Sequence, residues 1–428
     1  MAATLQRLFN VRRDEILPVL LSALFFFCVL TALMVLRPAR EALGMQRGID
    51  AVRWLFIGTA LVTLLVNPVF GLLVSRLRRL HFIAATYLFF ALSLLAFYLV
   101  MVFAPAAIGV ASGQVFYIWF SVFNLFATMV FWALMVDRFS LEQSKRFFGV
   151  IAVGGTCGAI FGPWLASMLA APLGTPALLL VSIAFLLMAV AAAWGVARLR
   201  PDRDLAAGVP EEGDHERIGG SAWDGFIATF RSPYLLGIAA YVIILAIMAT
   251  FIYFIRLQMV AALETDLDSR TTLFARIDMI TQIATLVMQM LIAGHLMRRF
   301  GVAVTLALLP LTVALGFIGL ALVGSLAALI TFDAAFRAVQ RAIMRPARET
   351  LYTVVSREDK YKSKAFVDTF VYRAGDVVGA QVEGLLGRLG MGLAAVASVA
   401  VPLALLWTAL AIWLGRTQQR IAAERKGL

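Results

Sequence analysis

The chain is poor in the residues that build disulfides, metal sites and soluble surfaces. Its 428 residues include two cysteines and three histidines, and only 14% of them are charged. Cys28 and Cys157 fall far apart in apolar stretches, which favours simple packing roles for both. No two histidines form a metal-binding pair. We therefore predict no disulfide framework, no metal site and no cofactor, and the sequence contains no nucleophile, base or metal constellation typical of an enzyme.

Long apolar runs dominate the rest of the sequence. Hydrophobic residues make up 62% of the chain and the mean hydropathy is +0.91, whereas soluble domains are roughly 45–50% apolar. Such runs must be helical in lipid, because only helices or closed barrels satisfy their own backbone there, and these runs are too long and uniform for barrel strands. The sequence predicts an all-α integral membrane protein with twelve transmembrane helices, at 16–36, 54–75, 82–103, 114–136, 147–171, 176–197, 234–257, 273–297, 302–322, 326–350, 365–387 and 392–415.

The formal net charge of +12 is distributed in a way that orients the chain in a membrane. The two terminal segments and the even-numbered loops between predicted spans carry 24 basic residues, and the odd-numbered loops carry four. Because basic loops remain cytoplasmic, we predict a multi-pass protein of a bacterial inner membrane with both termini in the cytoplasm. Its expected partners are the lipid bilayer and a small anionic solute, with no nucleic acid and no obligate protein partner.

The sequence divides into two similar halves. The interval 200–233 is rich in proline, glycine and charge, and it separates six predicted spans in 1–199 from six in 234–428. Basic residues recur between the halves at offsets of 218 to 220 residues, in the pairs Arg37 and Arg256, Arg78 and Arg298, Arg146 and Lys364. This regularity predicts two parallel six-helix repeats joined by a cytoplasmic linker, the architecture described for major facilitator transporters.

Ionisable residues concentrate in a few predicted spans, above all in the tenth. Asp333, Arg337, Arg341 and Arg345 recur there every four residues, and Arg348 follows. This spacing keeps them near one face of a helix. One arginine at the bilayer centre costs roughly 3 kcal/mol on insertion scales, so three or four facing lipid would cost about 10 kcal/mol. The stripe therefore predicts a polar path that faces protein, water or an anion.

The end of the first span contains a second group of charged residues. Arg37, Arg40 and Glu41 lie within one helical turn, and two guanidiniums three residues apart form a fork suited to phosphate or carboxylate. The alternative is that these arginines, like Arg345 and Arg348, pair with neighbouring carboxylates or with helix ends.

Further ionisable and polar residues in the spans complete the predicted site. We expect Arg276 to pair with Asp278, and Asp368 to pair with Arg373, whereas Asn124 is expected to be buried in the fourth span. The predicted substrate-binding residues are Arg37, Arg40, Glu41, Asn124, Arg256, Arg337, Arg341, Arg345, Arg348, Arg373 and Asp376. The predicted gating residues are Asp137, Arg138, Lys364 and Asp368.

Three strings of the sequence carry more specific motifs. They read LRPAREAL, FWALMVDRFSLEQSKRFFGVIAVGGTCGAIFG and MRPARETLYTVVSREDKYKSKAFVDTFVYRAGDVVGA. Together they resemble the nucleotide (ATP/ADP) translocase family of plastids and intracellular bacteria, a distant branch of the major facilitator fold. The matching segments are Arg40-Glu41-Ala42-Leu43, Phe131-Trp132, Lys145-Arg146-Phe147, Pro346 to Glu349, Lys362-Ser363-Lys364-Ala365 and Val367-Asp368. The resemblance implies ATP binding and ATP:ADP antiport, with arginines that neutralise the phosphates of the substrate.

The chain departs from that family's pattern in places that concern the substrate. The segment 375–379 has an acid, Asp376, where the family has a lysine, and no glutamate stands near Asn124. Because of these departures, the resemblance supports the fold and an anionic substrate better than it supports ATP itself. Two rival interpretations stay open: a proton-coupled transporter of another organic anion, with Asp333, Asp376 or Glu383 as proton carrier, and a membrane sensor or scaffold that does not transport.

Overall fold

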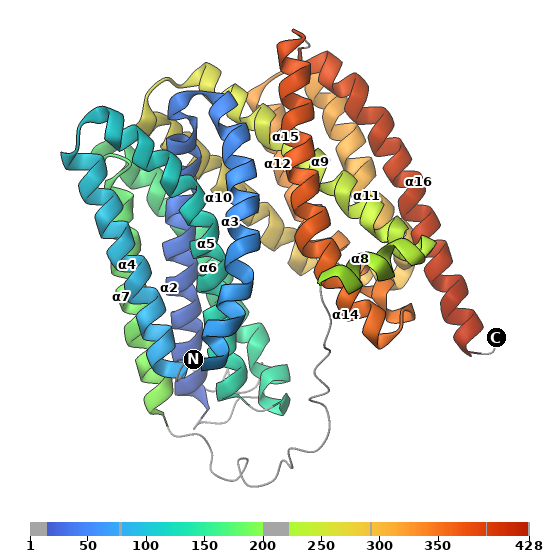
Figure 1. Ribbon diagram of the computed structural model, residues 1–428, viewed down its shortest axis with the longest axis horizontal. Coiled ribbons are helices and arrows are strands. Elements are labelled where there is room, and N and C mark those ends of the chain that lie inside the picture. Colours follow the sequence, from blue (N-terminus) through green and yellow to red (C-terminus); the bar gives the residue numbers. More distant parts are fainter. Residues whose placement is uncertain are drawn as a thin grey trace. The chain divides into compact units, whose positions relative to one another are not determined.

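The computed structural model describes residues 15–76, 79–139, 141–199, 222–291, 293–390 and 392–426, which form helices and contain no β-strand (Figure 1). The α-helices are α2 (Ile16–Gly44), α3 (Ile49–Arg76), α4 (Arg79–Phe103), α5 (Ala106–Arg138), α6 (Leu141–Leu173), α7 (Ala177–Arg198), α8 (Ala222–Arg231), α9 (Pro233–Leu263), α10 (Leu267–Leu291), α11 (Ala293–Val323), α12 (Leu326–Val339), α13 (Arg345–Leu351), α14 (Arg357–Phe366), α15 (Tyr372–Arg388) and α16 (Leu393–Lys426). Short turns of other helix types are η1 (Met45–Arg47), η3 (Gln340–Met344), η4 (Tyr352–Val354) and η5 (Val367–Val371), of which η3 and η5 are π-helical.

Each predicted span has a helical counterpart. Among the described residues, nine helices are long and apolar enough to cross a membrane by length and composition, and they coincide with the predicted spans 1 to 7, 9 and 12. The other three predicted spans coincide with α10, with α12–η3–α13 and with α14–η5–α15, whose charged residues lower their hydropathy. The predicted all-α membrane fold is therefore confirmed.

The ends of several helices differ from the predicted ends. The helix α14 begins at Arg357, before the predicted 365, and α16 continues to Lys426, past 415, because their polar ends remain helical. The predicted break between spans eight and nine falls at Gly301, whose φ of +74° interrupts α11. Glycine adopts this backbone conformation without steric cost.

The helices group into two compact units. The first comprises Met1–Glu212 with Val260–Met279, and the second comprises Gly213–Met259 with Ile280–Leu428. The helices α9 and α10 thus each contribute residues to both units. The predicted linker 200–233 contains α8, and the predicted halves 1–199 and 234–428 remain a sequence-based division.

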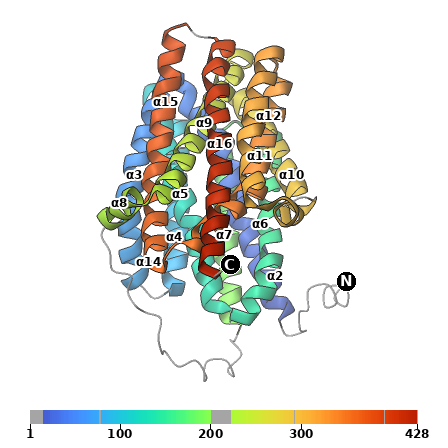
Figure 2. The same ribbon diagram turned by 90° about the vertical axis from the view of Figure 1, so that its right-hand side faces the viewer.

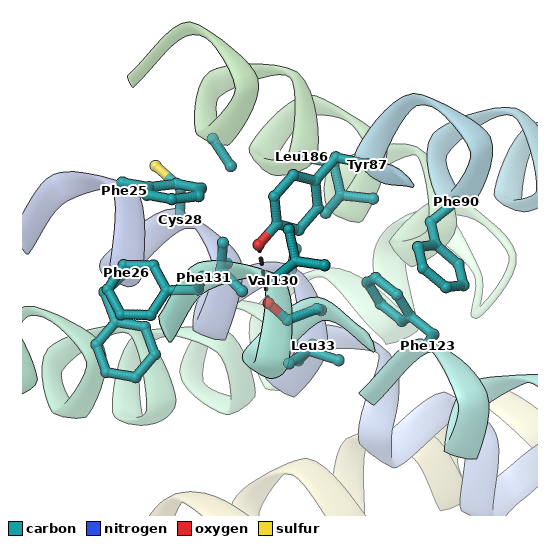
Figure 3. Close-up of a cluster of buried hydrophobic side chains, with 14 of the residues drawn as sticks. Phe25, Phe26, Cys28, Leu33, Tyr87, Phe90, Phe123, Val130, Phe131 and Leu186 are labelled. Carbon is teal, nitrogen blue, oxygen red and sulfur yellow. Dashed lines mark hydrogen bonds between the residues drawn. The ribbon is translucent and has the colours of Figure 1, made fainter. Parts of the chain in front are cut away.

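The core of the first unit is rich in aromatic side chains. Phe26 stacks on Phe131 with ring centroids 4.1 Å apart, and Phe25 meets Tyr87 edge to face at 5.8 Å (Figure 3). The Tyr87 hydroxyl donates a hydrogen bond of 2.8 Å to the backbone oxygen of Ala127, which satisfies its polar group within the core. These contacts hold α2, α4 and α5 together and position the charged end of α2.

Glycines allow α6 to approach α2 closely. A Cβ atom added at Gly154 would lie 2.3 Å from the backbone oxygen of Ala23, and one at Gly158 would lie 2.4 Å from that of Phe27. Small residues at this spacing let membrane helices meet at their backbones. The two glycines therefore set how closely α6 packs against α2, because neither has a side chain to hold the helices apart.

A similar contact recurs in the second unit, between α15 and α9 (Figure 2). A Cβ at Gly375 would lie 2.6 Å from the Ala246 Cβ and 2.9 Å from the Ile243 backbone oxygen. Gly375 follows Gly158 by 217 residues, close to the offsets that relate the two halves of the sequence. The matching contact supports an origin of the halves by duplication.

We predict that Gly158→Ala destabilises the protein although alanine is the better helix former. The added methyl group meets backbone of α2 and forces the helices apart, at a cost of about 1–3 kcal/mol. The midpoint of thermal unfolding in detergent is the measurement. Gly149→Ala is the matched control, because Gly149 lies in the same helix with nothing within 4 Å of its added Cβ. Equal midpoints for the two variants would contradict the prediction.

Candidate functional site

The second unit buries a carboxylate between two arginines. Asp333 of α12 accepts a hydrogen bond of 2.8 Å from Nε of Arg337, and its other oxygen lies 3.6 Å from Nη1 of Arg256 on α9. We call Arg256, Asp333 and Arg337 the arginine cluster. Arg256 is only 1% exposed, and the three side chains together carry one excess positive charge. The four-residue spacing within α12 places Asp333 and Arg337 on one face, where Arg256 reaches them from the neighbouring helix.

The stripe of arginines changes its surroundings where the helix becomes π-helical. Arg341 donates a hydrogen bond of 2.5 Å to the side-chain oxygen of Gln282 on α10. Arg345 is exposed, and among the described residues its guanidinium group makes no hydrogen bond or ion pair. The Arg345 backbone N–H closes a π turn on Gln340, and Pro346 has no N–H with which to restore the regular α-helical pattern. After this turn Arg345 is exposed and Arg348 pairs with Asp368, whereas Arg337 before it pairs with Asp333.

The last arginine of the stripe joins α13 to η5. Arg348 Nη2 lies 3.0 Å from Asp368 Oδ1 and 3.9 Å from Glu349 Oε1. Glu349 also forms a short ion pair with Lys364 of α14. These contacts connect α13 with both α14 and η5 through alternating charges.

Tyr372 lies among the charged residues of this region, and the sequence-based prediction omitted it. Its side chain is half-buried and is near enough to Arg345, Arg348, Arg373 and Asp376 for their charges to affect its phenol group. Its position four residues after Asp368 and four before Asp376 places it on the face of a helix that carries both carboxylates, a signal present in the sequence. Tyr372 therefore adds a hydroxyl group to the charged region that contains Arg345.

Two glutamines in the spans are also partners of predicted ionisable residues. Gln282 accepts the hydrogen bond of Arg341, and Gln258 of α9 donates one of 2.6 Å to Glu383 of α15. Glu383 is 2% exposed. An amide within an otherwise apolar stretch is the signal that sequence reasoning passed over.

The first unit gives each arginine of the predicted fork its own carboxylate. Arg37 Nε lies 3.5 Å from Oδ2 of the buried Asp278 on α10. Arg40 Nη1 donates a hydrogen bond of 2.8 Å to Oε1 of Glu41, and its guanidinium lies 3.6 Å above the ring of Tyr117. The alternative of pairing with a neighbouring carboxylate thus describes Arg40, whereas Arg37 pairs with a carboxylate from another helix. A role of either arginine in substrate binding stays a prediction.

Three sequence-based expectations about side chains are wrong. Asp368 pairs with Arg348, and Arg373 pairs instead with Asp376 at 3.1 Å, one helical turn along α15. Asp278 pairs with Arg37, and Arg276 is exposed. The expected burial of Asn124 is also incorrect, because this residue of α5 is exposed.

The predicted gating residues are dispersed among different contacts. Arg138 donates hydrogen bonds to the backbone oxygens of Val196, at 3.3 Å, and Leu199, so it closes the end of α7. Lys364 and Asp368 lie in the charged network of α13 to η5. The side chain of Asp137 lies outside the described residues.

Comparisons with known proteins identify the fold. The model of the Major Facilitator Superfamily matches residues 11–348. A bacterial homologue of the iron transporter ferroportin has a TM-score of 0.64 at 13% identity, over 94% of this chain and 98% of that one. The nucleoside transporter NupG has a TM-score of 0.60 at 13% identity, over 94% and 99%.

A third solved structure, a POT family transporter in complex with a thioalcohol-conjugated peptide, has a TM-score of 0.62 at 11% identity, over 94% and 96%. No curated protein matches the chain. The solved structures are too distant in sequence to inform on substrate, so their likeness concerns the fold. Since the family model covers most of the sequence, the chain belongs to the Major Facilitator Superfamily, a superfamily of membrane transporters.

Proposed function

We propose that this transporter works by alternating access and exchanges nucleotides of the ATP/ADP type, or a related phosphorylated anion. The observation that carries the proposal is the excess of guanidinium groups along α12–η3–α13. This segment has four arginines and two carboxylates, Asp333 and Glu349, and its Arg345 is exposed without an ion pair in the described residues. Cationic side chains are costly in a membrane, and an anionic substrate would offset that cost.

The chemistry of these groups suits phosphate. A guanidinium offers a planar fork of N–H donors that binds phosphate oxygens in pairs and stays charged at any physiological pH. Arg345 and the Tyr372 hydroxyl together provide charge and a directional donor. Without an anion, repulsion among the arginines disfavours an occluded empty carrier, so exchange is favoured over net transport.

Reconstitution in liposomes tests the proposal. We expect labelled ATP to enter vesicles preloaded with ADP and not empty vesicles. Uptake that is independent of internal nucleotide would contradict exchange. Absence of uptake into loaded vesicles, with folded protein confirmed by thermal unfolding, would contradict a nucleotide substrate and direct the search to other anions.

Arg345→Gln is predicted to lower the exchange rate by about 10- to 100-fold, because a hydrogen bond to a charged group contributes about 1.5–3 kcal/mol. The expected midpoint of thermal unfolding is unchanged, since the residue is exposed. Arg276→Gln is the control, because Arg276 is also an exposed arginine of a predicted span. An Arg345→Gln variant that exchanges at the wild-type rate would remove Arg345 from the site.

A second candidate function is proton-coupled transport of an organic anion. The observation that favours it is Glu383, a buried carboxyl group hydrogen-bonded to the amide of Gln258. An amide can donate to a carboxylate or accept from a protonated carboxyl group, so it suits both states. Uptake driven by a pH gradient and abolished in Glu383→Gln would support this function. Uptake that depends only on internal substrate would exclude it.

A further inference from the structure

The short helix α8 presents an apolar face to its surroundings. Phe226, Ile227 and Phe230 are 39%, 43% and 57% exposed, whereas Thr229 is fully buried on the other side. At about 100° per residue, the exposed side chains and the exposed Arg231 occupy about 140° of the helix surface. The helix thus has one face packed within the unit and an adjacent face that is apolar and basic.

The apolar face continues onto the helix against which α8 packs. Phe226 contacts Phe230 at a centroid distance of 4.5 Å and meets Phe366 of α14 edge to face at 5.7 Å. Phe366 in turn stacks on Phe370 at 5.8 Å, and Phe370 is exposed. We call Phe226, Phe230, Phe366 and Phe370 the aromatic band. It leads from α8 to η5, where the predicted span of α15 begins.

The direction of α8 and the charges beside it indicate what covers this face. The helix lies across the long axis of α15 (Figure 1), as expected for a helix in the plane of a membrane surface. The helix α8 ends two residues before the spanning helix α9 begins, and Leu236 in the first turn of α9 is exposed, so α8 lies directly before a membrane span in the chain. Together α8 and α14 contain five basic and three acidic residues.

We propose that α8 is an interfacial helix that binds the headgroup region of anionic phospholipids. Phe226, Ile227 and Phe230 enter the boundary between headgroups and acyl chains, and the exposed Arg231 contacts lipid phosphate. Aromatic and aliphatic side chains beside basic residues are the composition of such helices. Because α14 carries Lys364, which pairs with Glu349 of α13, lipid contact at α8 also braces the charged network of the second unit.

A fluorescent label on α8 tests this contact in the full-length protein. The label is attached at Ile227→Cys in a Cys157→Ser background, and Cys28 stays in place because it is buried. The protein is reconstituted in phosphatidylcholine alone or mixed with phosphatidylglycerol. Spin-labelled lipids carrying the quencher near the headgroups are expected to quench the label about threefold more strongly in the anionic membrane. When Phe230→Glu is introduced into the labelled protein, quenching in the anionic membrane should fall to the level measured in phosphatidylcholine alone.

Labels at two control positions give the quenching expected in lipid and in water. Leu406→Cys on the exposed side of α16 reports a lipid-facing site. Glu424→Cys reports water, because the 34 residues of α16 extend about 51 Å and exceed a hydrocarbon core of roughly 30 Å. Quenching at α8 equal to that at Glu424 would overturn membrane contact, and equal quenching in both lipid mixtures would overturn anionic preference. A label shielded from aqueous iodide and from lipid quenchers alike would show that a protein covers α8, which also overturns the proposal.

Discussion

Replacing Arg40 by alanine is expected to destabilise the protein by about 3–5 kcal/mol, the usual cost of removing one partner of a buried ion pair. Glu41 is 2% exposed and would lose the guanidinium that now lies 2.8 Å away. The variant also loses the contact with the ring of Tyr117 and the hydrogen bond from Nε to the Tyr117 backbone oxygen, which join α2 to α5. The expected decrease in the midpoint of thermal unfolding is about 6–20 °C, using the scaling for domains of 150–250 residues.

The chain contains its own reporter for this measurement. Cys28 is fully buried in α2 and becomes reactive to a thiol-specific dye on unfolding, provided that the exposed Cys157 is replaced by serine. The control is Arg276→Ala, which replaces an exposed arginine of α10 and should change the midpoint of thermal unfolding little. Replacing Arg40 and Glu41 both by leucine should recover most of the loss, because no buried charge then remains at either position. An Arg40→Ala variant with a wild-type midpoint and lost exchange would instead identify Arg40 as a substrate ligand.

Replacing Asp333 by alanine is expected to have an effect of similar size, about 3–5 kcal/mol. This carboxylate contacts two buried guanidiniums, those of Arg256 and Arg337, and its removal leaves the arginine cluster with two positive charges and no negative one. Asp333→Asn should be nearly as harmful, because the amide keeps the volume and loses the charge. The measurement is again thermal unfolding followed through Cys28.

A double variant distinguishes the effect of charge on stability from the effect of packing at the arginine cluster. Arg337→Leu combined with Asp333→Asn removes one of the two excess cations, so it should be more stable than Asp333→Asn alone. A double variant that is less stable would contradict the electrostatic explanation. The same experiment bears on Asp333 as a proton carrier, because a carrier must be neutral in part of its cycle without unfolding the protein. Full stability of Asp333→Asn would therefore support that rival interpretation.

The fold could be predicted largely from the sequence because the thickness and polarity of a membrane determine the length of each apolar run and the position of the charged loops. Apolar runs of span length, charged loops on one side and a constant offset between halves each follow from the cost of polar groups in lipid. The ends were less predictable, since α14 and α16 extend into polar sequence where hydropathy gives no signal. The break at Gly301 fell within the predicted interval because glycine and the neighbouring basic residues mark a turn.

The pairing of charges could not be predicted in the same way. Spacing within one helix correctly relates Asp333 to Arg337, four residues apart. The pair of Arg348 with Asp368 instead depends on how α13 meets η5, and the pair of Arg37 with Asp278 on the packing of α10 beside α2. The sequence-based prediction also assumed a regular helix through 340–344, with the arginines near one face. The structure has a π turn there, and the arginines have different partners and different exposure.

The glycine contacts and the π turns divide the protein into stiff and compliant parts. Where α6 meets α2 at Gly154 and Gly158, and where α15 meets α9 at Gly375, backbone touches backbone, so no side chain can change rotamer to accommodate sliding. We therefore expect each of these helix pairs to move as one rigid body when the protein changes conformation. The π turns η3 and η5 interrupt the regular α-helical hydrogen bonding; η3 ends directly before Arg345, and η5 contains Asp368. We therefore expect bending to occur at the π turns, beside Arg345 and Asp368, rather than within the helix pairs that meet at glycines.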